Sequence, residues 1–497
     1  MPESVERADA TGLPKFTTLQ FVGGVWREGS GPERQIKSPY DGSLLAIIRD
    51  ASKQELDDAV KAARDAHRAW WDAGPGVRAA TLRQAANRLR EHAEELALID
   101  ALDCGNPLKG MKFDVALGAT LIDYFAGLTA EAKGETIPQR DGRITYVRRD
   151  PVGVVARLVA FNHPLMFAAA KMAAPLAAGN AVIVKPSDET PLSALRMAAL
   201  IEDLFPKGLL SVLTGGAELG ADICGHEGIS AVGLIGSVNT GKAVLRGGAD
   251  TLKRTQLELG GKNALVICED ADVDAAIAGA VKGMNLGWTA GQSCGSTSRI
   301  LVHESLHDRV VEGIAAAFAD VRLGNPADED TEMGCLSTQA QYQKVTGYIE
   351  RALSEGAVLA AGGEPEGVPS EGFFVRPTLF SGVKPHMKIA REEVFGPVLS
   401  ILSWRDESEM LDIVNGLDVG LTASVWTEDL NTAMRLTDLI QAGYVWVNDS
   451  SDHYLGAPFG GVKNSGIGRE ECLEELLAYT EQKTVTIVPK QRDPKKQ

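Results

Sequence analysis

The chain has 497 residues, and at roughly 100–200 residues per domain this length indicates two to four domains. Apolar residues make up 44% and charged residues 24%, as in ordinary globular proteins, so a large core needs no disulfide or metal to hold it. Six cysteines without a CxxC pair argue against a secreted disulfide scaffold and a zinc module. The formal net charge of −17 disfavours general binding to nucleic acid or to an anionic membrane.

The start of the chain carries acids where a signal peptide has basic residues, and no apolar core follows. The most apolar stretch, 167–184, is interrupted by Lys171, Pro175 and Asn180. A transmembrane helix needs about 20 mostly apolar residues, so this stretch is not predicted to be one. We therefore expect a cytoplasmic protein without a membrane segment.

Short apolar runs split by Gly and Pro predict small strands in the first 50 residues. Ser52 and Glu55 then form a capping-box pattern, S-x-x-E, before apolar residues at helical spacing. A second helix is predicted over 77–103, and Gly105 is placed as its C-terminal stop.

Strands alternate with helices from residue 152 onward. The runs 152–160 and 181–186 predict buried strands, and the stretches 166–178 and 193–205 predict the helices that follow them. This alternation indicates an α/β fold with a parallel sheet covered on both faces. Such sheets bind ligands at the carboxyl ends of their strands. A second alternating region begins near Gly260 and continues to about residue 460.

Two further strand candidates, 143–150 and 483–488, lie outside both alternating regions. The first ends a linker-like insertion that begins at Glu131. Because neither candidate belongs to a main unit, we expect them to pair across subunits.

A cysteine among small polar residues is the first candidate for chemistry. Cys294 lies in GQSCGSTSR, where a carbonyl group can approach a nucleophilic thiol. A buried structural cysteine is the alternative interpretation, because free cysteine often packs as a small hydrophobic side chain.

Two polar residues follow predicted strands. Glu258, in QLELGGK, can act there as a general base, although the local pattern alone favours a surface glutamate. Asn162, in VAFNHPLMF, offers amide N–H donors that suit an oxyanion, and an asparagine in a turn is the alternative.

Two turns after strands have the character of a nucleotide site. The segment 236–241, GSVNTG, follows a strand and opens a helix, where backbone N–H groups can bind phosphate. It is not the usual G-x-G-x-x-G fingerprint. The segment 185–189, KPSDE, places a lysine and acids where they can hold ribose hydroxyls. Ordinary loop chemistry is the alternative for both.

The order of these clusters along the chain resembles the NAD(P)-dependent aldehyde dehydrogenase superfamily. The resemblance runs from about residue 22 to 488 and is carried by ELGGK, GQ-x-C-x-x-x-SR, EEVFGPV and PFGGVKNSGIGRE. It implies a Rossmann-type cofactor domain (1–130 and 152–260), an α/β catalytic domain (261–462) and a β bridging flap (131–151 and 478–492). The flap implies a homodimer or homotetramer.

The resemblance also implies residue roles. Cys294 would be the nucleophile, Glu258 the general base, and Asn162 with the backbone N–H of Cys294 the oxyanion hole. Lys171 and Glu470 match positions implicated in proton movement. The positions that match cofactor-binding residues are Lys185, Ser187, Asp188, Gly236, Ser237, Gly241, Leu259, Glu393 and Phe395.

Departures from the family pattern concern the substrate. The positions that the resemblance places around the substrate are His163, Phe167, Ala170, Ser451, Asp452, His453 and Phe459. His163 replaces a common aromatic residue, and Ala170 replaces a common tryptophan. We therefore expect a wide, polar mouth and a bulky or polar aldehyde.

The sequence thus predicts NAD-dependent oxidation of an aldehyde to its acid, without a metal ion. Asp188 favours NAD, because it can accept a hydrogen bond from the ribose 2′-hydroxyl. Use of NADP is left as an alternative, because Asp is one methylene shorter than the glutamate of strongly NAD-selective family members. A CoA-acylating semialdehyde dehydrogenase and a non-catalytic relative are the alternatives. The presence of Glu258 argues against the first, and the presence of Cys294, Asn162 and Glu258 together argues against the second.

Overall fold

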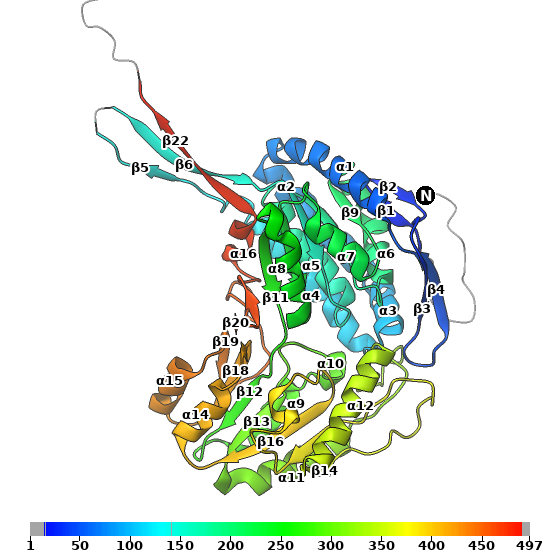
Figure 1. Cartoon of the computed structure of the whole chain (residues 1–497), viewed down its shortest axis with the longest axis vertical. Helices are drawn as coiled ribbons and strands as arrows, with labels where there is room; N and C mark the ends of the chain where they lie inside the picture. Colours follow the sequence, from blue (N-terminus) through cyan, green and yellow to red (C-terminus); the bar gives the residue numbers. More distant parts are fainter. Residues whose placement is uncertain (1–13, 15, 141, 490–497) are drawn as a thin grey trace, which may run out of the picture.

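The computed structural model describes residues 14, 16–140 and 142–489, and two large sheets dominate it (Figure 1). The first has eight strands in this described part, in the order β2-β1-β9-β8-β7-β10-β11-β21. Their bounds are Val25–Arg27, Gln20–Val22, Leu210–Val212, Ala181–Lys185, Val154–Leu158, Ala231–Ile235, Arg254–Glu258 and Gly466–Ile467. β9, β8, β7, β10 and β11 run parallel, as the alternating sequence pattern predicts.

Helices cover both faces of this first sheet (Figure 1). They are α1 (Lys53–Asp72), α2 (Pro75–Glu91), α3 (Ala93–Cys104), α4 (Leu108–Gly127), α5 (Pro164–Ala177), α6 (Leu192–Ile201), α7 (Ala217–Gly225), α8 (Val238–Gly248) and α16 (Leu473–Ala478). The strands β7, β8 and β10 are buried along their whole length, because helices pack on either side of them.

The second sheet has the order β14-β15-β16-β13-β12-β18-β19 and is parallel from β15 onward. Its strands span Val358–Ala361, Thr378–Ser381, Val398–Trp404, Arg299–His303, Ala264–Ile267, Thr422–Trp426 and Tyr444–Val447. The helices of this half are α9 (Val273–Gly283), α10 (Leu286–Thr289), α11 (His307–Ala319), α12 (Gln339–Ser354), α13 (Lys388–Arg391), α14 (Glu407–Asn415) and α15 (Leu430–Leu439).

Smaller sheets complete the fold. β22 (Thr480–Ile487), β6 (Ile144–Pro151) and β5 (Glu135–Ile137) form an antiparallel sheet that projects from the body (Figure 1). β3 (Glu33–Lys37) and β4 (Leu44–Arg49) form an antiparallel ribbon beside the helices that cover the first sheet (Figure 1). β17 (Val419–Gly420) pairs with β20 (Val462–Lys463).

The start of α1 follows the predicted capping box. The Glu55 carboxylate accepts from the Ser52 backbone N–H at 2.6 Å, which satisfies a donor that the helix itself leaves unpaired. Gly105 ends α3 in the left-handed conformation, with φ 82°, as expected of a C-terminal glycine.

The single helix predicted over 77–103 is wrong, because the chain forms two helices there. At His92 the backbone leaves the helical conformation, with φ −110° and ψ 23°, and α3 starts again at Ala93. Apolar periodicity alone does not reveal this break, because both helices bury leucines and alanines against the same core.

The division of the chain into three units stays a prediction. The antiparallel strand β21 pairs with β11 of the first sheet, and α16 packs onto the same core through Leu476. β21, and all of α16 except its last residue Ala478, lie between 463 and 477, outside the ranges that the sequence assigned to any unit.

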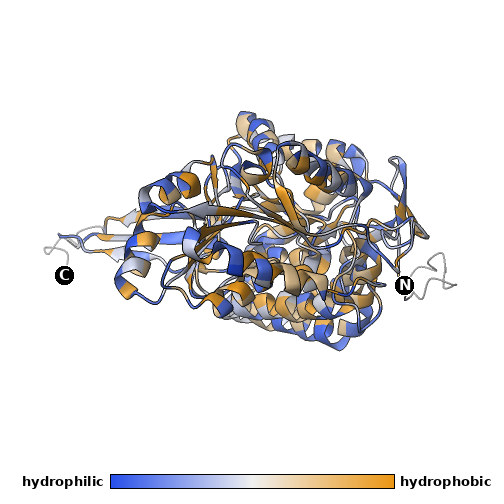
Figure 2. Cartoon of the chain, turned by 90° about the horizontal axis from the view of Figure 1, so that it is seen from below, coloured by the Kyte–Doolittle hydropathy of each residue, from blue (hydrophilic) through white to orange (hydrophobic). Residues whose placement is uncertain are grey.

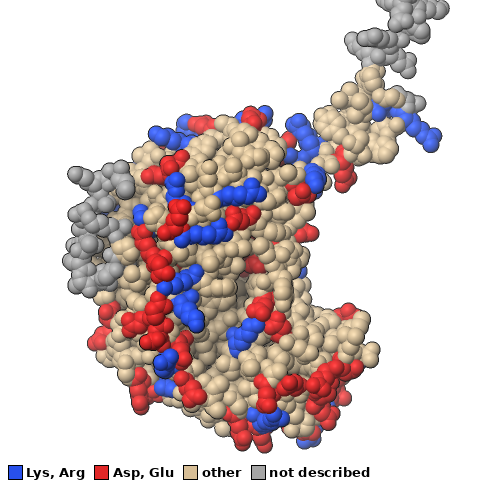
Figure 3. All heavy atoms as spheres, turned by 180° about the vertical axis from the view of Figure 1, so that it is seen from behind, with Lys and Arg blue, Asp and Glu red and all other residues tan. Residues whose placement is uncertain are grey.

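Polar and charged residues are distributed over the surface as in ordinary globular proteins. Helices of the body carry hydrophilic and hydrophobic residues side by side, so that one face of each helix can pack inward (Figure 2). Acidic and basic side chains are interspersed on the face in Figure 3, and acidic ones are numerous over its lower half. Among the described residues, no helix combines the length and the apolar character needed to cross a bilayer.

Candidate active site

The candidate site lies where the carboxyl edge of the first sheet meets the amino edge of the second. Asn162 follows β7 and Glu258 ends β11, so both stand at carboxyl ends of parallel strands. Cys294 and Glu393 precede β13 and β16, at the amino ends of the second sheet. Residues far apart in sequence thus meet because two sheets face each other edge to edge.

A cavity of about 530 Å³ contains the predicted nucleophile, the predicted base and the Lys171–Glu470 pair. This volume lies within the usual range for small-molecule sites. Residues that line it are Phe113, Leu117, Leu121, His163, Met166, Phe167, Lys171, Ile235, Glu258, Lys282, Asn285, Trp288, Ser293, Cys294, Gly295, Ser451, Asp452, His453, Tyr454, Leu455, Phe459, Glu470 and Glu471.

The Cys294 loop is held by a residue that sequence reasoning missed. The Asn263 side-chain amide donates to the carbonyls of Cys294 and Ser296, at 2.6 and 2.9 Å. Cys294 is partly exposed in the cavity, whereas the other five cysteines, all of them described, are buried. Burial of the thiol, together with the charge of Glu258, raises the pKa of Cys294 to about 12.

Asn162 lies beside this loop. One N–H of its amide donates to the Gln292 carbonyl at 2.8 Å. Gln292 is two residues before the nucleophile, so this bond fixes the Asn162 side chain beside Cys294. The Asn106 amide donates to the Asn162 carbonyl at 2.9 Å and holds the backbone as well. Since an amide nitrogen carries two hydrogens, a second N–H of Asn162 stays available for a ligand oxygen.

Glu258 is a buried carboxylate without a hydrogen-bond partner for either oxygen among the described residues. Burial, reinforced by the negative charge of Glu470, raises its pKa well above the ordinary value for a glutamate. A carboxyl group with a raised pKa inside a cavity is the usual state of a general base.

Behind Glu258, Glu470 joins two buried cations. Its carboxylate accepts from Lys171 Nζ at 2.7 Å and from Arg157 Nη2 at 2.6 Å, and all three side chains are buried. Burial would raise the pKa of Glu470, but the two cations outweigh burial and lower it. The Lys171 pKa is raised, because Glu470 and its neighbours outweigh burial. Arg157 was not predicted to be functional. The signal that was missed is a charged residue inside the buried strand β7.

The residues predicted to contact a pyrophosphate lie at the amino end of α8. Ser237 caps this helix, and its hydroxyl accepts from the Thr240 N–H at 3.1 Å. A Cβ at Gly241 would lie 2.6 Å from the Leu259 side chain, so glycine permits the close packing of α8 against that residue. The Gly236 N–H donates to the Glu258 carbonyl, which ties the turn to β11.

The residues predicted to hold an adenine ribose follow β8. Lys185 Nζ is buried and donates to the Pro186 carbonyl at 3.0 Å, which uses one of its three hydrogens. Burial lowers the pKa of Lys185. The Ser187 hydroxyl accepts from the Glu189 N–H at 3.3 Å. These unused donors fit a group that carries hydroxyls, and Asp188 offers an acceptor beside them.

Glu393 and Phe395, also predicted to contact the cofactor, lie in the segment before β16 and do not line the cavity. The Glu393 carboxylate accepts from the Gly261 N–H at 3.0 Å, and burial raises its pKa. Phe395 has a left-handed backbone, with φ 59°, an unusual state for a bulky residue that is found mainly at functional sites. The Gln341 side chain stabilises it by donating to the Phe395 carbonyl.

The polar residues expected at the substrate mouth line the cavity, but each has a protein partner. Asp452 pairs with Lys282 at 2.8 Å, and the Ser451 hydroxyl donates to the Asn285 side chain at 2.9 Å. His453 Nδ1 lies 3.1 Å from Glu471 and stacks on Phe459, with centroids 4.4 Å apart. Phe113, Leu117, Leu121, Met166 and Phe167 add apolar surface to the wall, so the mouth is less polar than the sequence indicated.

His163 belongs to a triad that sequence reasoning did not find, with Asp114, which is buried like His163, and the half-buried Trp288. Its Nδ1 lies 2.9 Å from one Asp114 oxygen, and the Trp288 indole N–H donates to the other at 2.6 Å. The His163 and Trp288 rings contact edge to face, with centroids 4.7 Å apart. The triad holds both rings in fixed positions in the cavity wall.

Ala170 needs a correction, because it is not part of the cavity wall. It is 1% exposed and packed inside α5, whereas Phe167 and Lys171 on the same helix line the cavity. Its small side chain therefore does not widen the mouth directly. It leaves space that a tryptophan would fill, and neighbouring side chains occupy that space.

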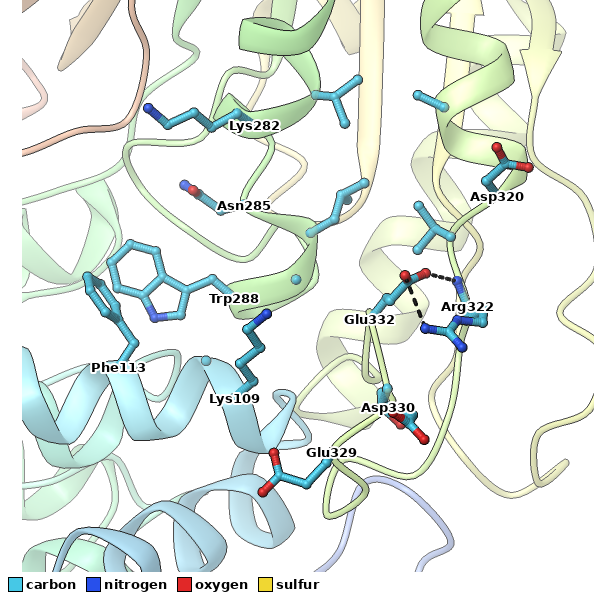
Figure 4. Close-up of a pocket in the computed structure, with 17 residues that line it drawn as sticks. Lys109, Phe113, Lys282, Asn285, Trp288, Asp320, Arg322, Glu329, Asp330 and Glu332 are labelled. Atoms are coloured by element: carbon cyan, nitrogen blue, oxygen red, sulfur yellow. Dashed lines mark hydrogen bonds and ion pairs between the residues drawn. The ribbon is translucent and has the colours of Figure 1, made fainter.

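A second, larger hollow of about 910 Å³ adjoins the cavity and shares Phe113, Lys282, Asn285 and Trp288 with it. Figure 4 shows its charged wall, in which Arg322 pairs with Glu332. Cys294 and Glu258 do not line it, so it is an outer groove beside the site. In the described part of the chain, no cluster of His, Cys, Asp or Glu side chains is arranged to hold a metal ion.

Comparisons with known proteins find aldehyde dehydrogenases, by sequence and by structure. A sequence model of the aldehyde dehydrogenase family matches residues 26–485. An aldehyde dehydrogenase of Talaromyces stipitatus, tropH, is 47% identical, over 94% of this chain and 92% of the relative. A betaine aldehyde dehydrogenase of Mesorhizobium japonicum is 41% identical, over 95% and 97%. The structure of a Bacillus cereus aldehyde dehydrogenase in complex with NAD+ is similar, with a TM-score of 0.92, 37% identity and coverage of 95% and 96%.

Proposed function

Because the chain belongs to the aldehyde dehydrogenase family, we propose that it oxidises an aldehyde to the carboxylic acid with NAD, through a thioester on Cys294. The observation that carries this proposal is the shared cavity of Cys294 and Glu258, with Asn162 fixed beside the same loop. The residues of this chain fit NAD, because the Lys185 ammonium and the Glu393 carboxylate each engage only one protein partner, and Ser237 caps the amino end of α8, where phosphate can bind. When bound, NAD accepts the hydride.

The first step belongs to Cys294. Its thiol is protonated at neutral pH, since the pKa is about 12, so attack requires removal of that proton. Cys294 is partly exposed in the cavity, so water accepts this proton, and Glu258 in the same wall acts as the base of the second step. The sulfur then bonds to the aldehyde carbon, and the oxyanion receives hydrogen bonds from the free Asn162 N–H and the Cys294 backbone N–H.

The second step is hydrolysis of the thioester. Glu258 accepts a proton from water, and the resulting hydroxide attacks the acyl carbon and releases the Cys294 sulfur. The Lys171–Glu470 pair lies in the same wall and offers a route by which the proton leaves Glu258. A CoA-acylating enzyme would not need this base.

The substrate is proposed to be a bulky aldehyde with an apolar body. The large apolar side chains in the cavity wall that would contact this body are Phe113, Met166, Phe167, Trp288 and Phe459. Polar groups of the substrate would meet Ser451, Asp452 and His453 at the rim, in competition with their protein partners. The cavity of about 530 Å³ would leave a two-carbon aldehyde largely unsupported.

NADH formation tests the activity. Purified enzyme is assayed with NAD and a panel of short aliphatic, benzylic, hydroxylated, cationic and carboxylated aldehydes. We expect the largest kcat/KM for bulky members and no stimulation by CoA. Cys294→Ala should abolish turnover, whereas Cys268→Ala, at the far end of β12, should retain it. Equal rates in Cys294→Ala and wild type would refute the covalent route.

The projecting sheet supports an assembly of several chains. β22 is an edge strand of eight residues that runs beyond the body, and Ile144 and Ile487 are exposed on this sheet. Unpaired edge strands are favourable sites for pairing with another chain. We expect a homodimer or homotetramer by light scattering, and dissociation after removal of residues 480–497.

A further inference from the structure

An arginine that sequence reasoning missed lies on the cofactor side of the site. Arg34, on β3, places Nη1 3.3 Å from an Asp188 oxygen. Asp188 is the acid expected to accept from the ribose 2′-hydroxyl. The contact brings the β3–β4 ribbon, which is not part of the first sheet, to the loop after β8.

Asp50 fixes the position of this guanidinium. Arg34 Nε and Nη2 donate to the two Asp50 oxygens, at 3.1 and 2.7 Å, and Asp50 is 6% exposed. A two-pronged contact of this kind holds the planar guanidinium in one orientation. The side chain of Arg34 is nevertheless 31% exposed, so its outer edge faces solvent.

The guanidinium also lies over the start of α7. A Cβ at Gly216, the N-cap residue, would lie 3.0 Å from Arg34 Nη2 and 3.5 Å from the Asp188 carboxylate. Lys185 ends β8, three residues before Asp188, and burial lowers its pKa, while the charge of Asp188 raises it and that of Arg34 lowers it further. The ribbon, β8 and α7 therefore meet in one charged corner.

The charge of Arg34 changes which dinucleotide this corner is expected to bind. An isolated acid accepts from a 2′-hydroxyl and repels a 2′-phosphate, whereas a nearby arginine accommodates that phosphate. Here Arg34 compensates the charge of Asp188. A guanidinium has five N–H donors, and the contacts with Asp50 and Asp188 engage three of them.

We propose that Arg34 is a specificity-determining residue that admits a ribose 2′-phosphate beside Asp188, so that the enzyme binds NADP as well as NAD. This inference rests on the proposed function, because it assumes that the dinucleotide occupies this corner. Asp188 then selects for the 2′-hydroxyl, and Arg34 limits that selection.

Titration calorimetry of the full-length protein with NAD, with NADP and with adenosine 2′,5′-bisphosphate tests the proposal without turnover. For wild type we expect NADP to bind within about tenfold of NAD. Arg34→Ala should raise the Kd of NADP and of the bisphosphate by roughly 10–100-fold, the value of hydrogen bonds to a charged group. The Kd of NAD should change less than about threefold.

Two variants and one control complete the experiment. Arg34→Ala leaves Asp50 without its cation, so Arg34→Lys serves as a second variant that keeps the charge, and its loss of NADP affinity should be smaller. Asp188→Asn should strengthen NADP binding. Arg49→Ala, on the neighbouring strand β4 and paired only with Glu28 at 3.5 Å among the described residues, should leave both affinities unchanged.

The outcomes separate the two proposals. Absence of NAD and NADP binding in wild type would contradict the proposed function. NAD binding with NADP weaker by more than about 100-fold would overturn the role of Arg34 alone. The same holds if a folded Arg34→Ala or Arg34→Lys protein binds NADP as wild type does.

Discussion

Lys171 Nζ lies 2.7 Å from Glu470 in a position closed to solvent, although both side chains face the cavity of Glu258. The pair keeps Glu470 charged, because Lys171 and Arg157 together outweigh the cost of burial. A charged Glu470 in turn helps to keep the pKa of Glu258 high. The ion pair therefore acts on the proposed base through space as well as supporting the fold.

Replacing Glu470 by Gln should destabilise the protein. The change leaves Arg157 and Lys171 buried without a counter-charge, and breaking a buried pair in this way typically costs about 3–5 kcal/mol. The free energy of unfolding from denaturant titration measures the effect. Glu474→Gln, at an exposed position on α16, is the matched control and should change stability by less than about 0.5 kcal/mol.

Glu258→Gln should separate the two chemical steps. Glutamine keeps the shape of the side chain and removes the base, so thioester hydrolysis slows more than its formation. Stopped-flow absorbance should show a burst of about one NADH per active site, followed by a much slower steady rate. Steady turnover at the wild-type rate would show that another group is the base.

The wild-type hydrolysis rate should also depend on pH. Because burial and Glu470 raise the pKa of Glu258, the fraction of active carboxylate increases with pH over a range above the usual one for glutamate. The steady rate should therefore rise from acid to neutral pH. Glu258→Gln should lose this rise, and a profile unchanged by the substitution would contradict the assignment.

Where a motif is local, the sequence places a residue in the fold. Glu258 and Lys185 end strands and Cys294 precedes one, each in a short stretch of distinctive residues, and alternation of strands and helices predicts which edge they occupy. The roles of these residues stay predictions. The parallel order of the first sheet follows from the same alternation.

Residues that act through distant partners escaped sequence reasoning. Arg34, Asn263 and Asp114 carry no local motif, and their roles arise from contacts with residues tens to hundreds of positions away. The polarity of the mouth was overestimated for a related reason. The partner of Asp452 is Lys282, and no periodic pattern links positions so far apart.

Asn162→Ala should weaken transition-state stabilisation. Loss of one oxyanion donor typically costs roughly 10²–10³-fold in kcat. We expect kcat to fall and KM to change little, because the ground-state carbonyl gains less from this donor than the oxyanion does. Steady-state kinetics with the best aldehyde measures both parameters. A change confined to KM would indicate a role in binding, and would contradict the oxyanion assignment.

Alkylation by iodoacetamide should report the state of the nucleophile. Cys294 is the partly exposed cysteine of the chain, and its pKa of about 12 leaves little thiolate at neutral pH. Without cofactor, we expect one label per chain by mass spectrometry and a rate that increases about tenfold per pH unit between pH 7 and 9. A rate that levels off near pH 7 would refute the raised pKa, and Cys294→Ala should take up no label.

Glu475 should make stability fall as pH rises towards neutrality. Its side chain is fully enclosed on α16, and burial raises its pKa to about 7, compared with about 4.3 in an unfolded chain. Between these values the folded state binds more protons than the unfolded state, so the free energy of unfolding decreases with pH. The stabilisation is complete below about pH 4 and is lost by about pH 7.

Glu475→Gln tests this dependence. Glutamine is neutral at every pH, and its carbonyl can accept the hydrogen bond that the Glu471 N–H donates to Glu475 at 2.8 Å. We expect the variant and wild type to be similar near pH 4.5 and the variant to be more stable at pH 8, by the order of 1–3 kcal/mol. Asp100, whose pKa burial raises to about 7, contributes its own loss to both proteins, so it cancels in the comparison. Denaturant titrations at several pH values measure the difference, and parallel stability curves would show that Glu475 does not titrate in this range.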